Sequence, residues 1–207
     1  MKILFQGDSV TDAGRDRSNY HDLGEGYPKY AAAMLQDAFP AVDFEFIDLG
    51  IGGNRTESLV ARLESDFIDI QPDIVSIMIG INDVWHRHSH GIMTTDEDIE
   101  RNYRAVLEAI KARTNARILI IQPLLMESAN PNVAELREEL TAAQAIVKRL
   151  ADEYADAYLP LDEILNAETK EAPAYYTADG IHPTPNGACY IGEAYLKAIA
   201  PLIELLS

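Results

Sequence analysis

The sequence predicts an α/β protein in which one parallel sheet is covered by helices on both faces. Short apolar segments alternate along the chain with segments whose apolar residues recur every three or four positions, as expected for βαβ units. The segment from Ile74 to Ile79 is almost continuously apolar, which is typical of a strand buried on both faces of such a sheet. The chain has 207 residues, 47% of them hydrophobic, and neither an internal repeat nor a linker divides it. Residues 1–207 are therefore predicted to form a single domain.

Five segments have the length and composition of strands. The first contains Ile3, Leu4 and Phe5 and stops at Gly7. The other four are predicted at Phe44 to Leu49, Ile74 to Ile79, Ile118 to Ile121 and, on a weaker pattern, Tyr158 to Leu161. The pattern does not determine the order of these strands in the sheet.

Helices are predicted from apolar periodicity and from capping residues. Pro28 suits the first turn of a helix that extends to Ala38. Thr95 with Asp98 resembles the capping box of a helix that continues to Ile110. The remaining helices are predicted at Thr56 to Ile70, at Val133 to Tyr154, and from Thr184-Pro185 to Leu202. The polar, glycine-containing segment from Asp12 to Gly26 is predicted to be a functional loop.

Polar residues that could form one site are scattered along the chain but follow the predicted strands. Ser9 follows the first strand, the glycine cluster ending at Gly53 follows the second, and Asn82 follows the third. Asp179 and His182 lie beyond the fifth strand, directly before the last helix. Because ligands bind at the carboxyl ends of the strands in open α/β sheets, these residues can converge there.

These residue types are the ones that acyl transfer needs. A serine hydroxyl such as that of Ser9 becomes a good nucleophile when a histidine, here His182, takes its proton. Asp179 can accept the other ring N–H of that histidine and hold its tautomer. The backbone N–H groups of Ser9 and Gly53 and the side-chain amide of Asn82 could form an oxyanion hole for the tetrahedral intermediate.

Each of these segments also has an ordinary structural explanation. Asp8 and Ser9 could cap the following helix, and the segment from Asp179 to Pro183 could be a simple turn. Asn82 could hold its own loop by bonding nearby backbone. The glycine cluster could be a tight turn, and because position 55 is arginine it lacks the third glycine of the dinucleotide fingerprint, so no cofactor is predicted. The joint occurrence of the segments, in this order, is what favours a catalytic site.

That combination resembles the GDSL, or SGNH, hydrolase family. Its blocks are recognisable as Gly7-Asp8-Ser9-Val10, Gly50-Ile51-Gly52-Gly53-Asn54, Gly80-Ile81-Asn82-Asp83 and Asp179-Gly180-Ile181-His182-Pro183. The resemblance implies a three-layer α/β/α sandwich, flavodoxin-like, with a five-stranded parallel sheet, and a serine esterase that needs no cofactor. It also implies that Ser9, Asp179 and His182 form the catalytic triad, with Ser9, Gly53 and Asn82 in the oxyanion hole.

A narrower resemblance is to the intracellular acetyl xylan esterase branch, whose members deacetylate xylo-oligosaccharides. It depends on Thr11-Asp12-Ala13-Gly14-Arg15, Gly24-Glu25-Gly26-Tyr27 and the segment from Ile77 to Trp85. Thr177-Ala178 stands before Asp179 where an aromatic residue is typical of that branch, so the wall of the substrate site is expected to differ. The resemblance implies an acetyl ester of a sugar as the substrate.

Several other residues have competing interpretations. Asp8 and Trp85 are candidate substrate-binding residues, although Trp85 could equally anchor its loop. His86, His88 and His90 alternate as metal ligands on a strand would, but in a polar loop they are expected to be solvated, and no metal site is predicted. Cys189 is expected to be a small core side chain of the last helix. Three arginines could contact substrate, but isolated arginines are expected to lie on the surface: Arg15, Arg17 and Arg55.

Composition restricts the partners and the location. The formal net charge of −17 argues against binding to nucleic acid or to an anionic membrane surface. No run of 18 apolar residues predicts a membrane span, and the N-terminal residues do not resemble a signal peptide. The single cysteine, Cys189, excludes an internal disulfide framework. A cytoplasmic enzyme with a small-molecule ester substrate is predicted, and a homo-oligomer is left open.

Three alternatives remain. The first is a lysophospholipase, thioesterase or arylesterase of the same family with broad specificity. The second is a metallophosphoesterase, with Asp8, Asp12, Asp83 and His182 as candidate ligands of a hard metal ion. The third is a carbohydrate-binding protein without activity, which predicts a broken triad.

Overall fold

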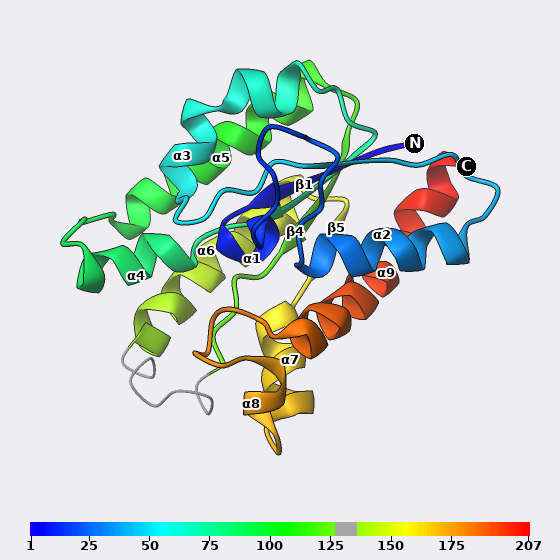
Figure 1. Ribbon diagram of the computed structural model, residues 1–207. Helices are drawn as coiled ribbons and strands as arrows, with labels where there is room; N and C mark the ends of the chain where they lie inside the picture. Colours follow the sequence, from blue (N-terminus) through cyan, green and yellow to red (C-terminus); the bar gives the residue numbers. More distant parts are fainter. Residues whose placement is uncertain (127–135) are drawn as a thin grey trace.

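Five parallel strands in the order β2-β1-β3-β4-β5 form the centre of the molecule (Figure 1). The structure is a computed structural model, and it describes residues 1–126 and 136–207. The strands are β1 (Lys2–Gly7), β2 (Glu45–Asp48), β3 (Ile74–Met78), β4 (Arg117–Ile121) and β5 (Ala157–Leu159). In the register of the sheet, Ile3 of β1 lies beside Phe46 of β2 and Ile74 of β3. The predicted parallel sheet is confirmed, with its strand order now known.

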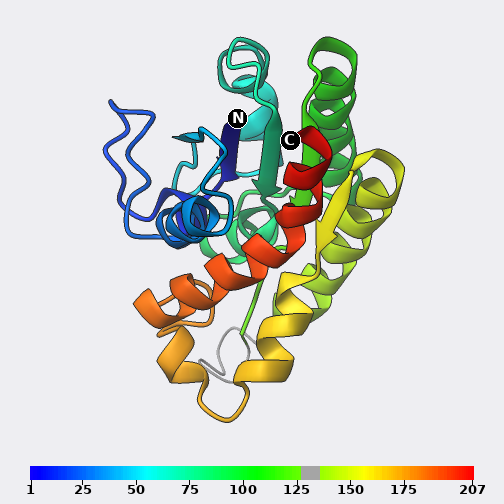
Figure 2. The ribbon, with the colours of Figure 1, turned by 90° about the vertical axis from the view of Figure 1, so that its right-hand side faces the viewer.

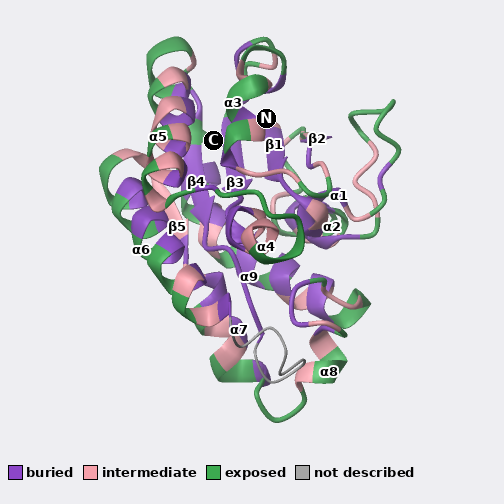
Figure 3. Ribbon diagram, turned by 90° about the vertical axis from the view of Figure 1, so that its left-hand side faces the viewer, coloured by how far each residue is buried: buried purple, intermediate pink, exposed green. Residues whose placement is uncertain are grey.

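Helices cover both faces of this sheet, as predicted for a three-layer α/β/α domain (Figures 1 and 2). On one face, α2 (Tyr27–Ala38) packs against α9 (Pro185–Leu206). On the other face, α5 (Asp96–Arg113) packs against both α3 (Thr56–Ala61) and α6 (Arg137–Tyr154). Figure 3 shows buried residues along the strands and on the sheet-facing sides of these helices. All five residues of β3 are buried, in agreement with its apolar sequence.

Two helix starts have the capping interactions that the sequence predicts. Thr95 accepts a hydrogen bond from the Asp98 N–H at 3.1 Å, and the Asp98 carboxylate accepts one from the Thr95 N–H at 3.0 Å. Thr184 accepts a hydrogen bond from the Gly187 N–H at 3.2 Å and so caps α9. Both predicted helices are thus confirmed.

Several element boundaries differ from the prediction. The single helix predicted at Thr56 to Ile70 is interrupted: α3 ends at Ala61, and a π-helical turn, η1 (Glu64–Ile68), follows. The predicted start of the long helix at Val133 lies outside the described residues, and α6 begins at Arg137 in the part that is described. The fifth strand ends at Leu159 rather than Leu161, because Leu161 already begins a helix.

Some short helices of the described residues lie outside the predicted ones. They are α4 (Ile81–Ser89), α7 (Leu161–Thr169) and α8 (Pro173–Tyr176). Because of α4, Asn82 and His86 lie on a helix, whereas the sequence predicts a loop for them. Among the described residues, no helix combines the length and the apolar composition needed to cross a membrane.

Candidate active site

Ser9 lies where β1 meets a one-turn helix, α1 (Ser9–Asp12). A Cβ atom on Gly7 would stand 2.3 Å from Thr11 Oγ1 and 2.6 Å from the Met78 carbonyl oxygen, so this sharp turn requires glycine. The Asp8 carboxylate caps the turn by accepting a hydrogen bond from the Val10 N–H at 3.1 Å. Ser9, whose side chain is not used as the cap, presents Oγ at 2.9 Å from His182 Nε2.

The position of Asp8 does not support the predicted contact with substrate. The residue is only 1% exposed, and its carboxylate faces the start of α1. Burial raises the pKa of Asp8 to about 7, and the hydrogen bond from Val10 opposes that shift. Asp8 therefore shapes the turn beneath Ser9 rather than lining an open surface.

Asp179 and His182 lie in the loop that connects α8 to α9, in contact with each other. The Asp179 Oδ2 atom is 2.6 Å from His182 Nδ1, and Oδ1 accepts hydrogen bonds from the N–H groups of Ile181 at 2.9 Å and His182 at 2.8 Å. Partial burial alone would raise the pKa of Asp179, but the hydrogen bonds from His182 and Ile181 outweigh it and lower the pKa. An ionised Asp179 favours the His182 tautomer with its proton on Nδ1, which leaves Nε2 free to accept the Ser9 proton.

Thr177 holds this loop closed. Its hydroxyl donates a hydrogen bond to the His182 carbonyl oxygen at 2.8 Å and accepts one from the Gly180 N–H at 3.1 Å. The residue is 1% exposed, and Gly180 has a φ of +90°, which favours glycine. Sequence reasoning treated Thr177 as part of the substrate-side wall, whereas its side chain points into the loop. The sequence does contain a signal for this role of Thr177, a threonine two residues before an aspartate in a predicted turn. Ser and Thr hydroxyls often form hydrogen bonds with nearby backbone.

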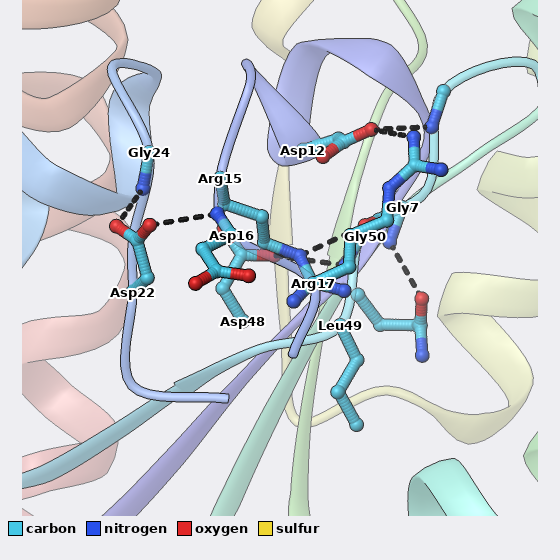
Figure 4. A network of polar contacts seen from close by, with 12 residues as sticks. Gly7, Asp12, Arg15, Asp16, Arg17, Asp22, Gly24, Asp48, Leu49 and Gly50 are labelled. Carbon is cyan, nitrogen blue, oxygen red and sulfur yellow. Dashed lines mark hydrogen bonds and ion pairs between the residues drawn. The ribbon is translucent and has the colours of Figure 1, made fainter. Parts of the chain in front are cut away.

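The loop between β2 and α3 carries Gly53 past the start of α1. A Cβ atom on Gly50 would stand 2.6 Å from the Asp12 nitrogen, so the two segments are in close contact. The Gly52 N–H donates a hydrogen bond to Asp12 Oδ2 at 2.8 Å. The same carboxylate pairs with Arg17 (Figure 4). Gly53 itself has a φ of +80° and is exposed. Asp12, which the sequence indicated only as a candidate metal ligand, instead fixes the peptide next to Gly53.

Arg15 is buried beneath the same loop, contrary to the prediction that it lies on the surface. Its Nε donates a hydrogen bond to the Gly50 carbonyl oxygen at 3.1 Å and lies 3.6 Å from Asp48 Oδ1 (Figure 4). Asp48 Oδ1 also accepts the Gly50 N–H at 2.8 Å. Burial raises the pKa of Asp48 to about 8, and the Gly50 N–H and the Arg15 guanidinium oppose that shift. The contacts of Arg15 tie the segment from Asp12 to Gly26 to the end of β2.

Asn82 lies in the first turn of α4 and points toward the Gly53 loop. Its Nδ2 donates a hydrogen bond to the Asn54 carbonyl oxygen at 3.0 Å. This is the local backbone contact that the alternative interpretation of Asn82 predicts, but an amide nitrogen carries two hydrogens, so one more remains to be donated. Asp83, the next residue, is buried and accepts hydrogen bonds from the Thr56 N–H and hydroxyl, which fixes α4 against α3. Burial raises the pKa of Asp83 to about 6.

The remaining candidates lie around this site. Trp85 is half-buried and packs against the hydrophobic core. His88 Nε2 lies 2.9 Å from Glu139 Oε1, so this ring faces α6. His86 and His90 contact each other, with ring centroids 4.5 Å apart. Within residues 1–126 and 136–207, no three His, Cys, Asp or Glu side chains are grouped as metal ligands.

Two further expectations need correction or refinement. Cys189 lies on α9 as predicted, but it is only partly buried and not a core side chain. Arg55 is partly buried and donates a hydrogen bond to Thr94 Oγ1 at 2.7 Å, so it links α3 to the segment before α5 rather than lying free on the surface. Arg17 is exposed, as predicted, and pairs with Asp12.

This chain is similar in sequence and in structure to several known proteins. The family model of the GDSL-like lipase/acylhydrolase family matches residues 5–188. The acetylxylan esterase of Geobacillus stearothermophilus is 32% identical, over 96% of this chain and 93% of that protein. A crystal structure of that esterase superposes with a TM-score of 0.85 at 31% identity, covering 95% of this chain and 92% of the other.

Two other relatives widen the comparison. A protein named as a GDSL-like lipase of Parabacteroides merdae superposes with a TM-score of 0.91 at 32% identity, covering 96% of this chain and 95% of the other. Thioesterase 1/protease 1/lysophospholipase L1 of Escherichia coli K12 is 27% identical, over 88% of this chain and 81% of that protein. The chain therefore belongs to the GDSL-like lipase/acylhydrolase family and is a carboxylic ester hydrolase.

Proposed function

We propose that this esterase hydrolyses short-chain acyl esters, acetyl esters above all, through an acyl-enzyme on Ser9. The observation that carries the proposal is the continuous set of contacts from Ser9 Oγ to His182 Nε2 at 2.9 Å and from His182 Nδ1 to Asp179 Oδ2 at 2.6 Å. Ser9 Oγ attacks the ester carbonyl carbon while His182 Nε2 takes the hydroxyl proton. When the tetrahedral intermediate collapses, His182 returns that proton to the departing alcohol. A water molecule then repeats the sequence on the acyl-enzyme and releases the acid.

The negative oxygen of the tetrahedral intermediate is proposed to bind between three N–H donors. These are the backbone N–H groups of Ser9 and Gly53 and the second hydrogen of Asn82 Nδ2. The first Asn82 hydrogen, bonded to the Asn54 carbonyl oxygen, fixes the direction of the amide before the substrate arrives. The Gly52 N–H bonded to Asp12 similarly supports the peptide before Gly53. Donors that are already oriented stabilise developing charge without a cost of reorganisation.

The proposed substrate class is an acetylated sugar, in particular an acetylated xylo-oligosaccharide. This is supported by the similarity to the Geobacillus acetylxylan esterase over nearly the whole of both chains. The site also lies open, with the side chains of His182 and Asp179 54% and 43% exposed, which suits a bulky polar leaving group. The second candidate is broad thioesterase and lysophospholipase activity, which the Escherichia coli relative favours. The cytoplasmic location and a homo-oligomeric state stay predictions from the sequence.

Acyl-chain kinetics test the proposal and separate the two candidates. The specificity constant kcat/KM is expected to be highest for p-nitrophenyl acetate and to fall steeply beyond about four acyl carbons, because each methylene that the pocket cannot accept loses about 0.8 kcal/mol of burial and adds a clash. The acetate, butyrate and octanoate esters are to be compared with acetylated xylo-oligosaccharides. A kcat/KM that rises through the octanoate ester would reject the acetyl esterase in favour of the second candidate.

Substitution of Asn82 tests the oxyanion hole. Asn82→Ala is expected to lower kcat by about 10²–10³ with little change in KM, because the lost hydrogen bond strengthens only as charge develops on the carbonyl oxygen. Steady-state kinetics on p-nitrophenyl acetate give both constants. Asn102→Ala is the matched control, since Asn102 lies on α5 and its amide donates to Thr56 Oγ1. A raised KM at unchanged kcat would make Asn82 a substrate-binding residue instead.

A further inference from the structure

His86 lies directly beside the proposed oxyanion hole. It follows Asn82 by one turn of α4, so the two side chains share a face of the helix. A Cβ atom on Gly53 would stand 4.0 Å from His86 Cε1, and a Cβ atom on the preceding Gly52 would stand 3.7 Å from the Cβ of Ser9. The imidazole edge therefore borders the same small surface as the nucleophile.

Neighbouring groups hold the ring of His86 in place. The ring of His90 packs against it, with centroids 4.5 Å apart and planes at 54°. The His86 carbonyl oxygen accepts hydrogen bonds from the N–H groups of His90 at 3.1 Å and Ile92 at 3.0 Å, which fixes the end of α4. Burial lowers the pKa of His86 most, and the nearby His90 and Arg55 lower it further. The ring is therefore neutral at pH 7.

The ring of His86 forms no hydrogen bond with the residues that the structure describes. Its Nδ1 atom is buried and has no hydrogen-bond partner among residues 1–126 and 136–207. A neutral imidazole offers one donor and one acceptor, and leaving a buried polar atom unpaired is unfavourable. Because Nδ1 is buried, a bound molecule could reach only the other ring nitrogen, Nε2, which also has no hydrogen-bond partner in the described part of the chain. A hydroxyl group of such a molecule could pair with Nε2.

We propose that His86 contacts the substrate, forming a hydrogen bond with a hydroxyl group on the alcohol part of a sugar ester bound at Ser9. This rests on the proposed function. An acetyl group has no polar atom besides its carbonyl oxygen, and that oxygen is assigned to the donors of Ser9, Gly53 and Asn82. The other oxygens of such a substrate can only accept a hydrogen bond, whereas its sugar hydroxyls can pair with an imidazole nitrogen as donor or as acceptor. His86 is therefore a determinant of specificity for the alcohol.

The test compares two acetate esters that differ in the alcohol. One is a monoacetylated methyl xyloside, which carries free hydroxyls, and the other is p-nitrophenyl acetate, which has none on its alcohol part. His86→Ala is expected to raise KM for the xyloside about three- to tenfold, the effect of losing one hydrogen bond, with kcat within about twofold. The kinetics of p-nitrophenyl acetate should stay within about twofold of the wild type. His86→Gln keeps a side-chain N–H donor and should recover part of the loss.

His88→Ala provides the matched control. His88 lies on the same helix, but its ring is bonded to Glu139 of α6, so neither substrate should be affected. Thermal unfolding of each variant verifies that the fold is retained. Equal losses on both esters, or no loss on either, would overturn the assignment of His86 to the sugar. So would a wild-type enzyme that cleaves p-nitrophenyl acetate but not the xyloside. A wild-type enzyme that cleaves neither ester contradicts the proposed function itself.

Discussion

Ser9→Ala is expected to lower kcat by about four to six orders of magnitude while the protein stays folded. In the proposed mechanism, Ser9 Oγ forms the acyl bond, and removing a serine nucleophile from a comparable triad costs about 10⁶ in kcat. The fold should survive because the Asp8 carboxylate, not the Ser9 hydroxyl, caps α1. Stopped-flow or spectrophotometric assay of p-nitrophenyl acetate measures the loss, and the melting temperature verifies the fold.

Ser18→Ala is the matched control for this variant. Ser18 is exposed in the segment after α1, and its hydroxyl bonds only to Asp16 among the hydrogen bonds of the described residues, so activity should be unchanged. A folded Ser9→Ala protein with nearly normal kcat would reject the assignment of the nucleophile. Unchanged wild-type activity in EDTA is also expected, and its loss on chelation would instead favour the metallophosphoesterase alternative.

Asp179→Asn is expected to lower kcat by about 10⁴ without displacing Ser9. An asparagine amide can donate to His182 Nδ1 and so stabilise the tautomer whose proton is on Nε2, which cannot accept the serine proton. Since hydrogen bonds lower the pKa of Asp179, the wild-type carboxylate is ionised throughout pH 6 to 9. The deficit of the variant should therefore persist over that whole range of the kcat profile.

Asp98→Asn serves as the control for the change of charge. Asp98 also accepts hydrogen bonds from backbone and side chain, but it caps α5, so its substitution should affect stability rather than kcat. If Asp179→Asn retains activity within about threefold of the wild type, then Asp179 only shapes its loop. Another carboxylate would then have to orient His182.

The sequence predicts the parts of this fold that depend on local patterns. The apolar run of β3 and the capping residues Thr95 and Thr184 act within a few positions, so their outcome could be read from the chain. The order of the strands could not be predicted, because it depends on contacts between residues far apart in the sequence, such as Ile3 beside Ile74. The helix α4 was missed although Ile81, Val84 and Trp85 have helical spacing; the short polar segment after them concealed it.

The site residues also divide into those that local patterns predict and those that depend on contacts between distant segments. Ser9, Asp179 and His182 were predicted as a group because each follows a recognisable segment end. The residues that support the site were not predicted. The burial of Arg15 depends on the fit of two distant loops, and charged residues are usually exposed. Asp12 accepts a hydrogen bond from Gly52, and Asn82 donates one to Asn54, so the Gly53 loop is held by contacts that no sequence spacing reveals.

The hydrogen bond between Ser9 and His182 joins residues 173 positions apart, which has a consequence for biosynthesis. The strand that leads to Ser9 is made before the other four, whereas the loop with Asp179 and His182 emerges after all five. At translation rates of about 5–20 residues per second, roughly 10 to 35 s separate the two. Because α9, which follows that loop, packs against α2, we expect the docking of α9 to bring His182 to Ser9. A nascent chain is therefore expected to carry Ser9, its proposed nucleophile, without the contact to His182 until α9 has folded into place.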